Sequence, residues 1–161
     1  RPTRTPAPTE VPSPTPVLIP LPEPATIGPV WDSLRDETYS VRVEVKALEW
    51  WQGDDFEKPR EGNVYALVQV SMENLGPGMI DGIGSMDFQA RDSNGVLRDD
   101  DYVTHLRDKY MEAGVDLMPG GVFSGWLAFQ VPATGTVELI YAPYRYESLE
   151  AGRYLSFTIR P

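Results

Sequence analysis

A run of alternating side chains in the second half of the chain places the strongest constraint on its fold. In residues 123–131 the odd-numbered positions are apolar or glycine, whereas Ser124 and Gln130 make the even-numbered side less apolar. A period of two is that of a β-strand, in which successive side chains point to opposite faces of a sheet. Residues 132–135 have the composition of a turn, after which the alternation resumes over residues 137–141. The sequence therefore predicts two strands that form a hairpin or a tight corner between two sheets.

Five further segments show the alternation of strands, and turn-forming residues separate them. Asn94-Gly95 lies between two of these segments and predicts a hairpin, because both residues tolerate the positive φ angles of a type I′ turn. By contrast, residues 99–114 are charged and irregular, which predicts a loop with one helical turn at most. The five segments are residues 39–47, 63–74, 86–90, 96–98 and 155–159.

These segments predict an all-β fold: an antiparallel two-sheet β-sandwich of about seven strands, with a closed barrel as the structural alternative. The folded domain is expected to span residues 31–161, which is enough chain to bury roughly two-thirds of its unfolded surface without metal or disulfide crosslinks. The chain contains no cysteine. The inward positions predict one shared core, formed by Val43, Val68, Phe88, Leu127, Phe129, Leu139 and Phe157.

The first thirty residues differ in composition from the rest and predict an extended Pro/Thr-rich stalk or linker. They carry 10 of the 16 prolines in the chain. Proline fixes φ and removes backbone donors, so a polyproline II spacer is expected here, and an ordinary disordered tail is the alternative. A spacer of this kind holds a domain away from a membrane or wall, which favours an extracytoplasmic location. Residues 17–21 are more apolar than a spacer requires, and we expect them to dock on another surface.

The charge of the chain restricts its partners. The net charge is −10, and residues 31–161 account for all of it, with 12 basic against 22 acidic residues. Such a domain repels phosphate backbones and anionic membrane surfaces, so we expect no binding to nucleic acid. No apolar run is long enough for a transmembrane helix, and neither a signal peptide nor a lipidation cysteine is recognised in the sequence.

Several short motifs follow one another in a characteristic order and spacing. They are residues 62–65, Glu73-Asn74, Asp87-Phe88, residues 92–95, Pro119-Gly120, residues 125–132 and residues 139–143. On these motifs the chain resembles, over residues 41–143, the telokin-like immunoglobulin-fold domains of bacterial lipoproteins and secreted proteins, a domain of unknown function. The resemblance implies an immunoglobulin-like sandwich, an extracytoplasmic site, membrane tethering through a linker and no established enzymatic activity. The lipid-bearing cysteine that these lipoproteins carry before the linker is missing here.

Residues that could carry chemistry are few. His105 is the one histidine of the chain, and it lies in an irregular charged stretch, so a surface histidine is favoured over a catalytic base. Residues 121–125 do not form the G-x-S-x-G turn of a hydrolase nucleophile. The acidic residues at 54–55 and 99–101 could offer oxygen ligands to calcium, but adjacent aspartates point in alternating directions, which favours solvated loops. No cofactor and no metal site are predicted.

The aromatic residues are the better candidates for a binding site. Residues 48–56 leave the strand pattern and contain Trp50, Trp51 and Phe56. If the strand continues that far, the two adjacent tryptophans face opposite sides, and the outward ring needs a cover. Outward aromatic rings on a β-sandwich stack on sugars or anchor a protein partner, or they simply cover the ends of the sandwich. The other candidates are Trp126, Tyr144 and Tyr146.

The sequence thus predicts a non-catalytic, extracytoplasmic interaction or accessory module on a Pro-rich stalk. We expect it to bind a protein partner, which could belong to a membrane or cell-surface complex. A carbohydrate-binding sandwich with exposed aromatic rings is the first alternative, and a hydrolase is the less favoured second. Stalk residues Val17, Leu18 and Ile19 complete the set of predicted contact residues.

Overall fold

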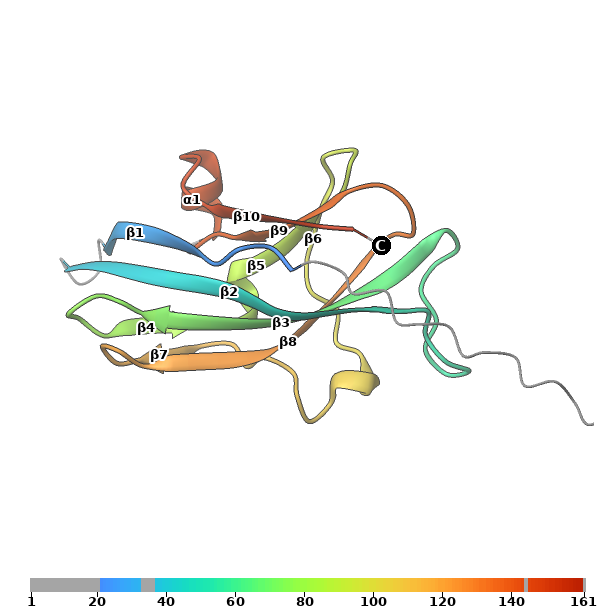
Figure 1. Ribbon diagram of the computed structural model, residues 1–161, viewed down its shortest axis with the longest axis horizontal. Helices are drawn as coiled ribbons and strands as arrows, with labels where there is room; N and C mark the ends of the chain where they lie inside the picture. Colours follow the sequence, from blue (N-terminus) through green and yellow to red (C-terminus); the bar gives the residue numbers. More distant parts are fainter. Residues whose placement is uncertain (1–20, 33–36, 144, 161) are drawn as a thin grey trace, which may run out of the picture.

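The computed structural model of the protein describes residues 21–32, 37–143 and 145–160. The fold is mostly β, and its strands pair antiparallel in two four-stranded sheets and one two-stranded sheet (Figure 1). The first sheet has the order β1 (Ala25–Asp32), β2 (Glu37–Trp51), β3 (Asn63–Asn74) and β8 (Val122–Pro132). The second sheet has the order β10 (Leu155–Ile159), β9 (Val137–Tyr141), β5 (Phe88–Arg91) and β6 (Leu97–Arg98). The small sheet joins β4 (Ile80–Ile83) to β7 (Val115–Leu117).

The two large sheets pack face to face over one hydrophobic core. Side chains of β2, β3 and β8 meet those of β5, β9 and β10 in a single buried cluster. Because the strands alternate, each contributes every second residue to this cluster. The prediction of a shared core is confirmed, since all seven of its residues are buried in that cluster: Val43, Val68, Phe88, Leu127, Phe129, Leu139 and Phe157.

The connection at residues 132–135 is a corner between sheets. β8 pairs with β3 in the first sheet, whereas β9 pairs with β5 and β10 in the second sheet. Of the two predicted alternatives, the sheet-to-sheet corner is therefore the one observed.

Four strands or helices were not predicted from the sequence, and residues 85–87, of which 86 and 87 were predicted to begin a strand, instead form a 3₁₀ turn before β5. β4 and β7 are short and lack sustained alternation, and α1 (Arg145–Glu150) follows turn-forming residues. The fourth is β1, in which Ala25 pairs with Val43 of β2. The expected boundary between residues 30 and 31 thus falls inside a strand, because β1 is a bulged edge strand interrupted by Gly28-Pro29 and shows no clean alternation.

The prediction of a type I′ turn centred on Asn94 and Gly95 was wrong, because the turn lies one residue earlier. The backbone N–H of Gly95 donates to the carbonyl of Asp92 over 2.9 Å, so Ser93 and Asn94 are the central residues of the turn. Gly95 follows them with a φ of 79°, a conformation that glycine adopts without strain. The Asp92 carboxylate also accepts the N–H groups of Asn94 and Val96, and this local bonding selects the earlier turn.

One bulge decides which face of the first sheet the end of β2 presents. The register with β3 shifts between Val45 and Ala47, so the side-chain parity of β2 inverts at this point. An unbroken alternation from Val43 would point Ala47 inward, but Ala47 lies opposite Gln69, on the outer face. Beyond the bulge, Trp50 lies opposite Ala66 on the core side, and Trp51 lies opposite Tyr65 on the outer side.

Residues 99–111, here called the strap, cross the outer face of the first sheet. Its 3₁₀ turn η2 (Thr104–Leu106) matches the predicted single helical turn. Val103 and Leu106 of the strap pack on Tyr65, Leu67 and Ala128 in a second buried cluster. The outer face of the first sheet therefore carries an apolar patch, with the strap as its cover.

Candidate functional site

The strap is fixed to the free edge of β8 by backbone hydrogen bonds. The Asp101 N–H donates to the carbonyl of Ala128, and the Trp126 N–H donates to the carbonyl of Lys109. The Met111 N–H in turn donates to the carbonyl of Trp126 over 2.8 Å. Gly125 permits this approach, because a Cβ at that position would lie 2.6 Å from the Met111 Cα. An edge strand that would otherwise expose unpaired groups is thus covered by the chain itself.

The two adjacent tryptophans of β2 do face opposite sides, as predicted. Trp50 is partly buried against the main core, and Trp51 packs against the second cluster. His105 of the strap stacks on Trp51 with a centroid distance of 4.8 Å and an interplanar angle of 22°. Tyr65 lies 5.4 Å from the Trp51 ring on the sheet itself. Part of the cover that the outward tryptophan needs is therefore supplied by this chain.

Trp126 also points to the outer face, where it packs against the second cluster under the strap. Its neighbour Tyr110 contacts Tyr102 edge to face, with the ring centroids 5.5 Å apart. Tyr102 itself is exposed. The strap thus carries two exposed aromatic side chains, Tyr102 and His105, and one that is partly buried, Tyr110.

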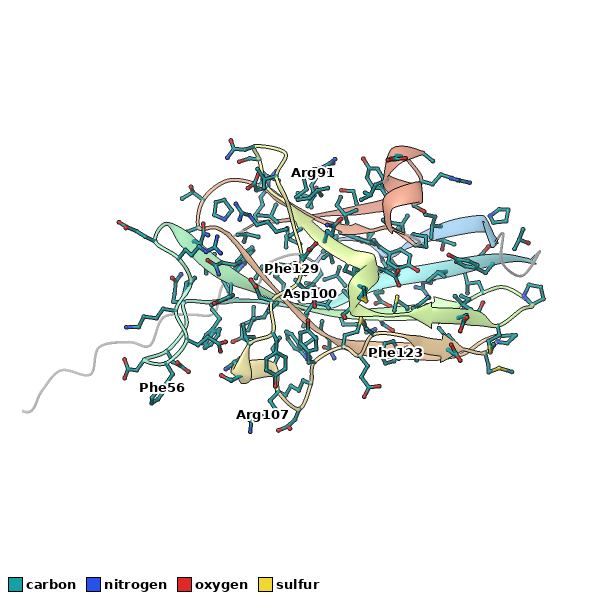
Figure 2. All side chains as sticks on the ribbon, turned by 180° about the vertical axis from the view of Figure 1, so that it is seen from behind. Phe56, Arg91, Asp100, Arg107, Phe123 and Phe129 are labelled. Atoms are coloured by element: carbon teal, nitrogen blue, oxygen red, sulfur yellow. The ribbon has the colours of Figure 1, made fainter. Side chains whose placement is uncertain are left out.

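Phe56 is the most exposed large apolar residue in the described part of the chain, with 98% of its surface open to solvent. It lies in residues 52–62, here called the Phe56 loop, and Figure 2 shows it at one end of the molecule. The loop is held by Asp54, whose Oδ1 accepts the N–H groups of Phe56 and Glu57 at 2.8 and 2.9 Å. The Asp54 N–H donates to the carbonyl of Glu57 over 2.9 Å. An Asx-type turn of this kind presents the ring on a preformed backbone.

Glu57 joins the Phe56 loop to the strap. Its Oε2 accepts hydrogen bonds from the backbone N–H and from the hydroxyl of Thr104, each over 2.9 Å. Glu57 and Thr104 are the sequence neighbours of Phe56 and His105, so this contact joins the two segments that carry these rings. We call the group formed by Trp51, Phe56, Tyr102 and His105 the aromatic surface.

Three of the aspartates singled out in the sequence, Asp54, Asp99 and Asp100, make side-chain contacts within the chain. Asp99 accepts a hydrogen bond from Gln89 over 2.8 Å, and Asp100 contacts the hydroxyl of Tyr110. Burial, together with the neighbouring Asp101, raises the pKa of Asp100. A cavity of about 260 Å³ lies beside them, lined by Arg60, Leu97, Arg98, Asp99, Asp100, Asp101 and Gln130. The described ranges contain no group of three or more His, Cys, Asp or Glu side chains that could hold a metal ion.

His105 lies near one acidic group, Glu49, with 3.7 Å between its Nε2 and the Glu49 Oε1. Both side chains are exposed, on the outer face of the first sheet. A hydrolase requires such a pair in a cleft with a nucleophile within hydrogen-bond reach. On this open surface the contact with Glu49 instead suits the orientation of the His105 ring on Trp51.

The remaining predicted contact residues cannot be placed on this surface. Val17, Leu18, Ile19 and Tyr144 lie outside the described residues. The backbone of Tyr146 belongs to α1, and its side chain is likewise outside the described part. Conversely, sequence reasoning missed Tyr102 and His105 as members of the aromatic surface. The signal was present in the spacing of apolar residues at 103, 106 and 110, which marks a segment packed on one side.

A family model, described as a domain of unknown function (DUF4352), matches residues 34–150 of the chain. The chain belongs to this family. No curated protein is significantly similar to it in sequence. Among the described residues, none of the helices has the length and apolar character to cross a bilayer.

Two solved structures of Bacillus subtilis proteins share the fold of this family member. The crystal structure of a putative lipoprotein, ycdA of strain 168, aligns with a TM-score of 0.61 at 21% identity, covering 74% of this chain. The aligned part spans only 36% of ycdA, about a third of that protein. The yjhA protein aligns with a TM-score of 0.53 at 17% identity, covering 74% of this chain and 90% of yjhA. At these identities the likeness concerns the fold alone.

Proposed function

We propose that the chain is a non-catalytic interaction module of immunoglobulin type that binds a protein partner through the aromatic surface. The observation that carries the proposal is Phe56, a fully exposed aromatic ring on a loop held by two hydrogen bonds to the Asp54 carboxylate and one backbone hydrogen bond. A phenylalanine ring that is exposed to water does not stabilise the fold, whereas a rigid aromatic anchor binds a partner at low entropic cost.

The surroundings of Phe56 favour a protein over a sugar. A sugar platform needs open, coplanar rings, but His105 covers one face of Trp51, and the rings of Tyr102 and Tyr110 meet at 63°. The segments that carry the rings include charged side chains of both signs: Glu49, Asp55, Lys58 and Arg107. An apolar anchor inside a polar rim is the arrangement common in protein interfaces.

The proposed location is extracytoplasmic. Two features support it: the Pro/Thr-rich composition of residues 1–30, and the similarity in fold to ycdA, which is named as a lipoprotein. The immunoglobulin-type assignment rests on two antiparallel sheets that pack over one core and on the corner that carries the chain from β8 to β9.

The proposal is tested by affinity purification from native cell envelopes with the full chain and with Phe56→Ser. The variant removes the ring that the partner would bury in the complex, but it removes no contact within the folded chain. We therefore expect partner recovery to fall about thirtyfold with an unchanged melting temperature. Met86→Ser is the matched control, because Met86 is also a large exposed apolar residue and lies outside the aromatic surface.

Two results would contradict this function. One is equal recovery of every co-purifying protein with the wild type and with Phe56→Ser. The other is a comparable loss with Met86→Ser, which would mean that general surface hydrophobicity, rather than the aromatic surface, retains the partner.

A further inference from the structure

Two loops at one end of the first sheet expose large apolar side chains. The loop after β3 carries Leu75 and Met79, which are 49% and 39% exposed. The loop before β8 and the first residue of that strand carry Met118 and Val122, which are 63% and 62% exposed. Figure 1 shows the β3–β4 and β7–β8 connections together at one end of the long axis, here called the tip. The Phe56 loop, which connects β2 to β3, lies at the other end.

A single buried residue fixes both loops. Asn74 is 1% exposed, and its side-chain amide donates to the carbonyls of Gly78 and Leu117 over 2.7 and 2.9 Å. Its Oδ1 accepts the N–H of Gly76 over 2.9 Å. The Asn74 backbone bonds in both directions with Gly120 and Gly121 of the other loop. A saturated buried amide therefore holds the apolar side chains outward, instead of letting the loops fold over the core.

The two loops of the tip carry no charged side chain, although the protein is strongly acidic, and the exposed Asp81 and Asp116 border them on β4 and β7. Residues 74–80 contain no charged side chain, and neither does the long stretch from 117 to 137, although the net charge of the chain is −10. Beside Val122 on the sheet, the Arg42 guanidinium lies 3.7 Å from the Glu73 carboxylate, so these two opposite charges offset each other. Unbranched methionines adapt to a fluid surface, and neutral apolar loops enter a lipid interface without desolvating charge.

We propose that the tip binds the interface of a neutral, zwitterionic lipid bilayer by shallow insertion of Leu75, Met79, Met118 and Val122. A terminal pair of loops meets a flat bilayer directly, whereas a protein partner would need a matching concave apolar pocket. Zwitterionic lipid is favoured because an acidic domain is repelled by an anionic surface. This site is separate from the aromatic surface, so each can be occupied while the other is bound.

The test is flotation of the full chain with phosphatidylcholine vesicles. We expect the wild type to float, and a double variant, Met118→Gln with Val122→Gln, to lose binding on the order of tenfold, because it removes the apolar groups that enter the lipid. Leu75→Glu should abolish binding by placing a charge at the interface. Met86→Gln, an equally exposed methionine outside the tip, should float like the wild type.

Melting temperatures of all variants separate lost binding from lost folding, and the single Met118→Gln variant replaces the double variant if the latter is destabilised.

The proposal is overturned if the wild type does not bind phosphatidylcholine, if the tip variants bind as the wild type does, or if binding appears only with anionic vesicles. It is also overturned if the tip substitutions abolish a complex with a soluble protein while vesicle binding is absent. Phe56→Ser should leave flotation unchanged, so failure here is distinct from failure of the protein-binding function.

Discussion

Asp87 is a carboxyl group whose surroundings make folding depend on pH. It ends the 3₁₀ turn η1 (Ser85–Asp87), and its Oδ2 accepts the N–H of Gly84 over 3.0 Å. Desolvation by burial raises the pKa of Asp87 to about 6, against an opposing contribution from that hydrogen bond. Because the folded-state pKa lies above the unfolded value, the folded state binds the proton more tightly, and the contribution of Asp87 to stability increases as pH falls through 6.

We therefore predict that lowering the pH from 7 to 5 raises the free energy of unfolding of the wild type by about 1 kcal/mol relative to Asp87→Asn. The asparagine keeps an oxygen for the Gly84 N–H but has no proton to gain. Urea denaturation of both proteins at the two pH values measures the difference. Parallel pH dependence of the two proteins would mean that Asp87 is not the responsible group.

At the residue scale, the sequence predicts opposite faces for Trp50 and Trp51 but not which ring faces the core. That choice depends on the bulge between Val45 and Ala47, which adds one residue to β2. A bulge leaves no reliable trace in an alternating sequence, since Lys46 fits the outward position in either register. The exposure of Phe56 was not predictable for a similar reason, because the Asp54 turn that lifts its ring depends on backbone geometry.

At the element scale, β1 shows that the Pro-rich composition and the folded domain overlap. Ala25 and Ile27 pack partly against the main core, and β1 pairs with β2 from Glu37 to Val43. Edge pairing and partial burial contribute to stability even though prolines surround the strand.

Deleting residues 1–24 should leave the melting temperature within about 2 °C of the full chain, whereas deleting residues 1–32 should lower it by about 5 °C or more, because the second deletion removes β1. Differential scanning calorimetry compares the three proteins. An equal melting temperature for both truncations would show that β1 does not stabilise the domain.

The strap is the element that sequence reasoning described least well. Its single 3₁₀ turn was predicted, yet its place over the outer face of the first sheet was not, because the contacts that hold it join residues far apart in the sequence. Leu106 is buried against Tyr65 and Leu67, and Glu57 bonds to Thr104. Such pairings depend on the completed sheet. The strongly periodic strands β3 and β8 depend mainly on their own side chains and were predicted within a residue or two.

At the scale of the whole molecule, the two exposed surfaces lie at opposite ends of the first sheet. β2 and β3 extend from the tip to the Phe56 loop, and the core between them is continuous (Figure 2). A rigid sandwich of this kind can hold a partner at one end while the other end rests on a bilayer. The net charge of −10 disfavours adhesion of either end to anionic surfaces.

Photo-crosslinking in living cells tests the protein-binding claim most directly. Benzoylphenylalanine incorporated in place of Phe56 reacts only with groups within a few ångströms of the ring, and the same probe in place of Met86 serves as the reference. We predict discrete protein adducts from position 56 that are absent from position 86. No protein adduct at position 56, or the same adducts from both positions, would contradict the account.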